Sequence, residues 1–293
     1  MRDKSKGYRI FTVLNYILLT LIAVICLYPF YYVVVASISD PESLLRHSGL
    51  LTHPLKEITF DGYRMVLSNR RVFSGYRNTL IVLAVGLVFN MVLTVLGAYV
   101  LSLKQLMLRK PLTIIVIFTM YFSGGLIPAY LNIQSLGMMD SLWALILPGA
   151  ISTSNLIIMR SAFYTVPDSL SEAAEMDGAN HLQILVKVML PLVRATLAVL
   201  VLYYGVSHWN AWFGASIYLR SDSKYPLQLV LRNILINSDS QDMMADIPAA
   251  YSPQVMLLIK YALIVVSSVP ILCIYPFLQR FFQKGVMIGA VKG

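Results

Sequence analysis

The sequence predicts an all-α membrane protein with six transmembrane helices. Of its 293 residues, 58% are hydrophobic and only 13% are charged, whereas roughly a quarter of the residues of a soluble domain are charged. The apolar residues also form long blocks, and a membrane-spanning helix needs about 20 such residues to cross a hydrocarbon core about 30 Å thick. Strands of a membrane barrel would instead alternate over about 10 residues. The composition and the block lengths therefore predict membrane-spanning helices.

Six blocks are long enough and contain no Asp, Glu, Lys or Arg. They are residues 11–39, 78–103, 111–139, 141–159, 195–219 and 261–279. The fourth and sixth are the shortest, and the fourth carries the polar run STSN at 152–155. Helix-disturbing residues within the blocks are Pro29, Gly124, Gly125, Pro128, Pro148, Pro270 and Pro276. Each predicts either a kink in the bundle, which we favour, or a broken helix that lines a pathway.

The distribution of charge predicts the orientation. With six spans, both termini lie on one side together with loops 104–110 and 160–194, and this side holds thirteen cations against five acids. Its net charge is +8, against +1 on the other side, out of a total of +9. Because positive loops stay cytoplasmic, we expect both termini in the cytoplasm. The basic balance is thus a sign of topology, and no nucleic-acid partner is expected.

This topology divides the chain into segments. They are a cytoplasmic N-terminus (1–10), a transmembrane domain (11–283) with external loops 40–77 and 220–256 and a cytoplasmic loop at 164–192, and a cytoplasmic tail (284–293). The apolar stretch 225–236 is about half the length of a span. We expect it to lie on the membrane surface or against the bundle.

The cytoplasmic loop predicts two short helices. Pro167 and Asp168 begin the first, and Ser169 with Glu172 has the spacing of a capping box. Gly178 ends it, because glycine accepts the left-handed conformation at a helix terminus. Asn180 can cap the second helix, which leads into the fifth span. Taken alone, these features fit an ordinary solvated loop.

The spacing of residues along the whole loop indicates a family resemblance. Glu172, Ala173 and Ala174 are followed after three residues by Gly178, and after nine more by the run VMLP at 188–191. The pattern resembles the EAA loop of ABC importer permeases, with Val188 in place of isoleucine as the one departure. The segments GYRNTL (75–80), YFSGGLIPAYL (121–131), SLWALILPGAISTSNLIIMRSAF (141–163) and GAVKG (289–293) are similar to the carbohydrate (maltose-type) permeases. The branch that they most resemble handles complex oligosaccharides such as alginate- or pectin-derived sugars.

The resemblance implies a type I ABC importer permease fold in the cytoplasmic (inner) membrane. It implies four kinds of partner: a second homologous six-span permease forming a heterodimer, two cytoplasmic ATPase subunits, an extracytoplasmic sugar-binding protein, and the lipid bilayer. The residues that would couple to the ATPase are Glu172, Ala173, Ala174, Asp177, Gly178, Leu190 and Pro191. The tail residues Gly289, Lys292 and Gly293 are a possible second contact with the ATPases.

The sequence contains no motif for binding and hydrolysing ATP. The phosphate-binding pattern GxxxxGK[S/T] does not occur in it, and no catalytic or metal-ligand cluster can be assembled from its motifs. We therefore expect a transport subunit rather than an enzyme, without a bound cofactor, with ATP and Mg²⁺ on the partner ATPases.

Two other transport functions stay open. An amino-acid or peptide ABC permease would fit the loop, although the sugar-type segments argue against it. An ion-coupled transporter working alone would be expected to carry ionisable residues inside its spans, and among the six blocks only His208 is a candidate for that role.

The fifth span contains residues suited to a sugar path. Aromatic rings stack on sugar faces, and amides and hydroxyls bind sugar hydroxyls. The candidates are Tyr204, His208, Trp209, Asn210 and Trp212, with Asn155 as a weaker one from the fourth span. The alternatives are an interfacial aromatic belt for the Trp and Tyr residues and interhelical hydrogen bonding for Asn155 and His208.

Overall fold

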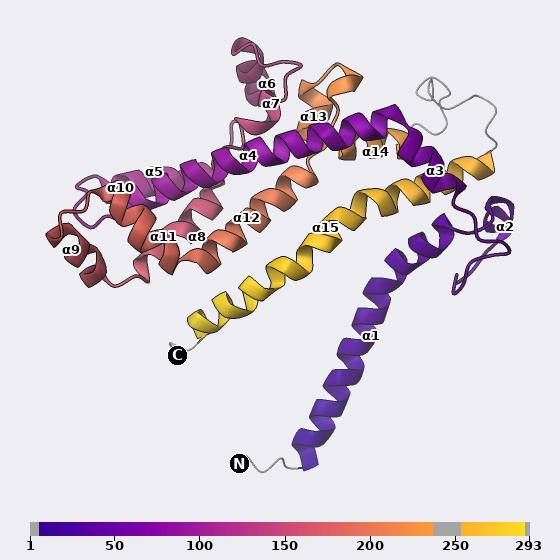
Figure 1. Cartoon of the computed structure of the whole chain (residues 1–293), viewed down its shortest axis with the longest axis horizontal. Helices are drawn as coiled ribbons and strands as arrows, with labels where there is room; N and C mark the ends of the chain where they lie inside the picture. The colour runs from indigo at the N-terminus through magenta and orange to yellow at the C-terminus, as the bar shows by residue number, and fades with distance from the viewer. Residues whose placement is uncertain (1–5, 237–252, 291–293) are drawn as a thin grey trace. The chain divides into compact units, whose positions relative to one another are not determined.

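The computed structural model describes residues 6–236 and 253–290, and every regular element in these ranges is a helix (Figure 1). The all-α prediction is therefore confirmed for the described part of the chain. The chain divides into two compact units. Among the described residues, the first holds 6–70, 233–236 and 253–268, and the second holds 71–232 and 269–290.

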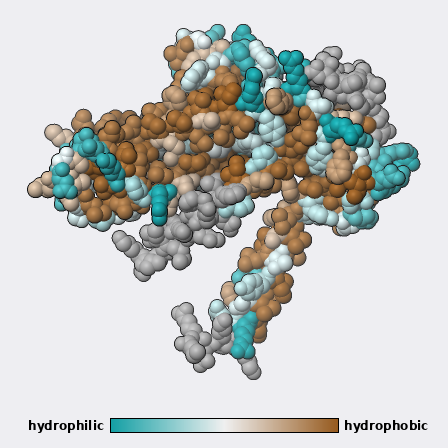
Figure 2. Space-filling view, in the orientation of Figure 1, coloured by the Kyte–Doolittle hydropathy of each residue, from teal (hydrophilic) through white to brown (hydrophobic). Residues whose placement is uncertain are grey.

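The first unit contains α1 (Lys6–Ser37), α2 (Pro41–Arg46) and α3 (Asp61–Ser68). None of the most apolar stretch of α1 is buried within the chain, and Figure 2 shows hydrophobic side chains along this helix. The end of α1 contributes Val35 and Ala36 to a small core that also includes Leu44 and Leu51. A lipid environment or a partner helix would cover an exposed apolar helix of this length.

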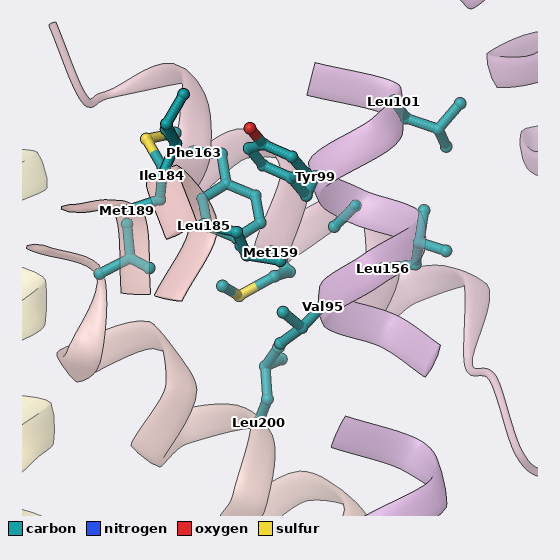
Figure 3. Packing of buried hydrophobic residues seen from close by; sticks show 12 residues of the cluster. Val95, Tyr99, Leu101, Leu156, Met159, Phe163, Ile184, Leu185, Met189 and Leu200 are labelled. Atoms are coloured by element: carbon teal, nitrogen blue, oxygen red, sulfur yellow. The ribbon is translucent and has the colours of Figure 1, made fainter. Parts of the chain in front are cut away.

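Four helices form the body of the second unit. They are α4 (Arg70–Ser102), α5 (Arg109–Tyr121), α8 (Thr153–Tyr164) and α12 (Arg194–Trp209). Helix α8 packs against both α5 and α12. The main core draws on α4, α8, α12 and the segment before α12, and Figure 3 shows Tyr99 of α4 beside Phe163 of α8 within it. Their rings meet edge to face, with centroids 6.0 Å apart.

Shorter elements connect these helices. They are α6 (Leu126–Ser135), α7 (Trp143–Ile146), α9 (Asp168–Met176), α10 (His181–Gln183), a π-helical turn η1 (Ile184–Met189), α11 (Leu190–Leu192), α13 (Phe213–Tyr218), a 3₁₀ turn η2 (Asp222–Lys224) and α14 (Leu227–Ile236). The last helix, α15 (Pro253–Ala290), has residues in both units. As expected for the stretch 225–236, α14 is only ten residues long. It packs closely on the start of α4, where a β-carbon on Gly75 would lie 3.1 Å from the Leu227 Cα.

The third and fourth apolar blocks do not each form one helix. The third is divided between α5 and α6, which are bent by 111° at residues 122–125. Gly125 permits the turn because its φ of +84° is open to glycine. The fourth block gives α7 and α8, separated around Pro148. At these two places the favoured kink is wrong, because the helix is broken. That the breaks line a pathway stays a prediction.

By length and apolar composition, three helices in the described residues can cross a membrane. They are 7–37, 70–102 and 255–274. Two bent pairs, α5 with α6 and the segment 181–192 with α12, raise the number to five if each pair counts as one span. A membrane protein with several spans is thus supported, while the sixth span and the orientation of the termini stay predictions.

Candidate functional site

The cytoplasmic loop of the sequence prediction, residues 164–192, forms a hinged pair of short helices and is called the coupling loop below. Helix α9 ends as predicted at Gly178, whose φ is +82°. The N–H of Gly178 donates to the Glu175 carbonyl at 2.9 Å, and the N–H of Ala179 donates to the Ala174 carbonyl at 2.9 Å. This pair of bonds is a Schellman ending, which satisfies two of the carbonyls that a helix terminus leaves free.

The two helix starts differ from each other. Asn180 caps the second helix as predicted, because its side chain accepts from the Gln183 N–H while the Gln183 side chain accepts from the Asn180 N–H. The expected helix start at Pro167 and Asp168 is confirmed, but the capping box expected at Ser169 and Glu172 is wrong, because α9 begins two residues before Leu170, where a helix capped by Ser169 would begin. Pro167 is the N-cap of α9 and makes no side-chain bond there. Ser169 is then inside the first turn, and the acidic residue of that turn, Asp168, pairs with Lys104.

The outer surface of α9 mixes acidic and apolar side chains. Met176 is 88% exposed, and Ala173 and Asp177 are exposed as well. A β-carbon added to Gly178 would have nothing within 4 Å. Glu172 and Glu175 are also exposed, but they line a space between α9 and the end of α4. The side of α9 that carries Ala173, Met176 and Asp177 is therefore accessible to another protein.

The inner surface of the coupling loop is part of the main core. Ile184, Leu185 and Met189 are buried in the cluster shown in Figure 3, and Leu190 packs against it. The return helix runs through the π-helical turn, reaches the exposed Pro191 and then bends by 86° into α12. The loop is therefore anchored to α4 and α8 by apolar packing on one side, whereas Ala173, Met176 and Asp177 are exposed on the other.

The candidate path residues contact different residues of the second unit. Tyr204 is 4% exposed, and its hydroxyl lies 2.7 Å from the Thr94 hydroxyl and accepts from the Ser152 N–H at 2.9 Å. His208 donates to the Asn90 side-chain oxygen at 2.7 Å. These two residues thus join α12 to α4 and to the turn before α8.

The amide of Asn90 completes this group. It is fully buried, and its nitrogen donates to the carbonyls of Gly149 and Ala150 at 2.7 and 3.0 Å. The break around Pro148 leaves backbone carbonyls without helical partners, and Asn90 satisfies two of them. Buried polar groups inside a bundle need such partners.

The other path candidates lie apart from this group. Trp209 is buried edge to face with Tyr76, with ring centroids 6.3 Å apart. Trp212 is 36% exposed under the Arg232 guanidinium, which lies 4.5 Å from its ring centre. Asn210 is exposed at the end of α12. Asn155, from the fourth block, is buried in α8. The structure therefore does not gather the six into one lining.

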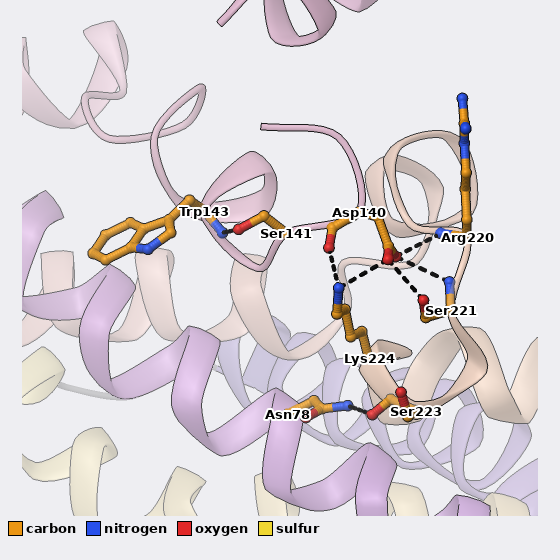
Figure 4. A network of polar contacts seen from close by, with 8 residues as sticks. All are labelled: Asn78, Asp140, Ser141, Trp143, Arg220, Ser221, Ser223 and Lys224. Carbon is orange, nitrogen blue, oxygen red and sulfur yellow. Dashed lines mark hydrogen bonds and ion pairs between the residues drawn. The ribbon is translucent and has the colours of Figure 1, made fainter. Parts of the chain in front are cut away.

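The opposite end of the second unit contains a polar cluster that the sequence reasoning missed (Figure 4). Asp140 accepts from the N–H groups of Arg220 and Ser221, from the Ser221 hydroxyl and from the Lys224 ammonium, all at 2.7–3.0 Å. We call these four residues the Asp140 latch. These donors, with Lys224 the largest influence, hold the Asp140 pKa far below its ordinary value of 3.8. Asp140 itself has φ +55°, which aspartate tolerates better than most residues.

The sequence did contain a signal for the latch. Asp140 is the only charged residue between Lys110 and Arg160. A cavity of about 620 Å³ adjoins the latch, lined in part by Arg77, Trp143 and Lys224. None of the six path candidates lines it.

Comparisons with known proteins define the class. The family described as "Binding-protein-dependent transport system inner membrane component" matches residues 107–288, which include the coupling loop and both broken segments. This protein belongs to the family of binding-protein-dependent transport system inner membrane components. That membership sets aside the ion-coupled transporter working alone.

Relatives in Bacillus subtilis (strain 168) extend the match to the whole chain. The "Polygalacturonan/rhamnogalacturonan transport system permease protein YtcP" is 40% identical over 97% of this chain and 99% of its own length. Protein LplC is 37% identical over 99% of this chain and 97% of its own length. The sequence resemblance to carbohydrate permeases is thereby confirmed.

Solved structures of ABC transporters also resemble this chain. A chain of a bacterial ABC transporter involved in the import of the acidic polysaccharide alginate has a TM-score of 0.87 and 34% identity, covering 96% of this chain and 100% of its own. A chain of a bacterial alginate ABC transporter in complex with a pentasaccharide-bound periplasmic protein has a TM-score of 0.62 at 14% identity, covering 96% of this chain and 98% of its own. The second likeness shows the fold alone.

Proposed function

We propose that this protein is one of the two permeases of an ATP-driven importer of oligosaccharides delivered by an extracytoplasmic binding protein. The observation that carries the proposal is the coupling loop, which is anchored by its apolar side to α4 and α8 and presents acids and Met176 on the other. A partner ATPase would dock on the exposed side, bind ATP and Mg²⁺, and drive transport. The contacts from Glu172 to Gly178 and at Leu190 and Pro191 are part of this proposal.

The proposed topology keeps six crossings, but α5 alone forms the third and α8 alone forms the fourth. The crossings are α1, α4, α5, α8, α12 and α15, and α6, α7, α13 and α14 lie on the external side. Helices α5 and α8 have 13 and 12 residues, or about 20 and 18 Å at about 1.5 Å per residue, so the flanking turns complete the crossing. The packing of α8 on both α5 and α12 supports this assignment. Both termini then lie in the cytoplasm, and the chain spans the cytoplasmic membrane.

We infer uronic-acid-containing oligosaccharides as the substrate class. The relative YtcP is named for polygalacturonan and rhamnogalacturonan transport, and the solved transporter at 34% identity imports alginate, an acidic polysaccharide. A peptide or amino-acid substrate has no such support. The second permease is proposed to be a homologue, which makes the transmembrane part a heterodimer.

Two parts of the site stay predictions. The contacts of Tyr204 and His208 favour a packing role for both, whereas Asn210 and Trp212 remain accessible enough to meet a sugar. In the proposed tail contact with the ATPases, Lys292 and Gly293 lie outside the described residues. Of Gly289, only its place in α15 is described.

The test is purification of the tagged chain from its native membrane with the proteins that accompany it. We expect a second six-span permease, an ATPase and a binding protein in the eluate. In proteoliposomes the complex should hydrolyse ATP faster with the binding protein and oligogalacturonate or oligoalginate than with neutral maltooligosaccharides. Recovery of the chain without an ATPase would refute the proposal, and equal stimulation by neutral sugars would refute the substrate class.

A further inference from the structure

The cytoplasmic end of the proposed α4 crossing is tied to α8 by a charged cap. Helix α4 ends at Ser102, so the Leu101 carbonyl has no partner within the helix. It accepts from the Arg160 Nε at 3.0 Å and from the Tyr164 hydroxyl at 3.2 Å. The Arg160 guanidinium also donates to the Tyr164 hydroxyl at 2.8 Å and lies 4.9 Å from the centre of its ring. A cation at a helix C-terminus is favoured because the helix dipole is negative there.

A second tie joins the same end of α4 to the start of α9. Lys104, two residues beyond α4, forms an ion pair with Asp168, the first residue of α9. The acid lies at the positive end of the α9 dipole, which favours its charge. Both side chains are more than half exposed, so the pair contributes little to stability by itself. It joins the start of the proposed docking helix to the segment that follows α4.

A cavity separates α9 from the end of α4. About 220 Å³ of space lies between them, lined among others by Ser102, Lys104, Asp168 and Glu172. Helix α9 packs against η1, and its Ala174 packs against the main core. Across the cavity, the Lys104–Asp168 pair is the contact that joins the start of α9 to the segment after α4.

Helix α4 is suited to carry a displacement along the membrane normal. It has 33 residues without a proline, which corresponds to a rod of about 50 Å. Near its other end, the buried Asn78 donates to the carbonyls of Ser223 and Tyr225, and the Thr79 hydroxyl accepts from the Leu227 N–H. The turn that these bonds hold also contains the Lys224 of the Asp140 latch.

We propose that Arg160, Tyr164 and the Lys104–Asp168 pair are positioning residues for coupling. Arg160 and Tyr164 join α8 to the end of α4, and the Lys104–Asp168 pair joins the docking helix α9 to the segment after α4. Movement of α9 with the ATPase then moves α4 and, through it, the turn at the other end. The inference rests on the proposed function. Without these ties, the ATPase would still bind and hydrolyse ATP, but fewer sugars would be imported for each ATP.

The test measures uptake and ATP hydrolysis together in proteoliposomes of the whole complex with its binding protein. We expect Arg160→Gln to lower the sugar-to-ATP ratio at least fivefold, and Arg160→Lys, which keeps a cation and a donor, to recover most of it. The single variants Lys104→Asp and Asp168→Lys should each lower the ratio, and the double exchange should restore at least half of it. Lys110→Asp, an equally charged change at an exposed lysine nearby, is the matched control and should leave the ratio unchanged.

Two results would overturn the inference. One is an unchanged ratio in Arg160→Gln and in both single charge reversals. The other is a loss that follows the amount of assembled complex and is not restored by the double exchange, because that would show a structural role only. Failure of the wild-type complex to import sugar would instead count against the proposed function.

Discussion

The two ends of α4 hold their neighbours in different ways. At Asn78 and Thr79, which are 2% and 1% exposed, buried side chains bond to backbone groups of a turn in the same chain. At the other end, the Leu101 carbonyl is bonded by Arg160 and Tyr164, but Lys104 and Asp168 form an exposed ion pair beside a cavity, and Asp177 is exposed. Polar groups at the first end are buried and committed within the chain, whereas several at the second end are exposed and accessible to a partner.

This contrast suggests that the two ends of α4 have different roles. Buried hydrogen bonds with fixed geometry keep an element in place, because breaking one leaves an unpaired polar group. Exposed ion pairs are weak and easily exchanged. The first kind suits a part that must move as a block, and the second suits a surface that docks. The following predictions test the contrast, from the largest expected effect to the smallest.

The strongest test concerns the coupling loop. Gly178→Val places a branched side chain at φ +82°, where it costs about 1–2 kcal/mol and weakens the Schellman ending. We expect uptake in proteoliposomes to fall about tenfold, with the protein still inserted. Gly178→Asn tolerates this conformation and should keep most of the uptake, while Gly178→Asp adds charge to the docking surface and should uncouple ATP hydrolysis from uptake. Normal uptake by the valine and aspartate variants would remove Gly178 from the coupling role.

A second test breaks the buried polar group between the ends. A β-carbon on Gly86 would lie 2.6 Å from the His208 Nε2, so Gly86→Ala must displace the ring that donates to Asn90. We expect a loss of about 1–3 kcal/mol in the free energy of unfolding, measured by denaturant titration in detergent. Gly205→Ala is the matched control, since nothing lies within 4 Å of its added β-carbon. Equal stability of the two variants would contradict a fixed His208–Asn90 contact.

A third test uses the pH dependence of the Asp140 latch. Asp140 lies between the third and fourth apolar blocks, and its pKa is lower in the folded protein than the ordinary 3.8. Its contribution to stability is therefore complete above pH 3.8 and is lost as the pH falls through the folded pKa. Asp140→Asn should lower the thermal midpoint in detergent by a few degrees at pH 7. The difference from wild type should shrink below pH 3.8, and a difference that grows there would show that another group is responsible.

The smallest effect is expected at the partly exposed aromatic residue beyond α12. Trp212→Ala removes the ring under Arg232. If the ring only anchors this segment, the KM for the oligosaccharide stays within about twofold of wild type and the amount of assembled complex falls slightly. A clear rise in KM with normal assembly would instead place Trp212 on the sugar path. Trp212→Phe serves as the conservative control.

Local rules predicted the local features of this molecule. The end of α9 at Gly178 and the cap at Asn180 depend on residues within four positions of each other, and both are confirmed. The capping box at Ser169 was wrong because a helix that begins at Asp168 places Ser169 inside the first turn. The acid of that turn, Asp168, instead pairs with Lys104, 64 residues away. Spacing within a loop carries no information about such a partner.

Long-range contacts also account for the misjudged apolar blocks. Hydropathy alone cannot tell a continuous span from two helices bent by 111°, since both need apolar residues. What allows the break around Pro148 is Asn90, which satisfies carbonyls 59 and 60 residues further along the chain. Likewise, the isolated charge of Asp140 was visible in the sequence, but its partner Lys224 was not.

The sequence separation within the Asp140 latch has a consequence for synthesis of the protein. Asp140 and Lys224 are 84 residues apart. At a translation rate of about 5–20 residues per second, Lys224 emerges about 4–17 seconds after Asp140. For most of this interval the carboxylate has none of its four donors, since Arg220 and Ser221 precede Lys224 by only a few residues, and it must stay hydrated. The Asp140 latch can therefore form only once the turn after α13 has been made, when α4 to α12 have already been synthesised.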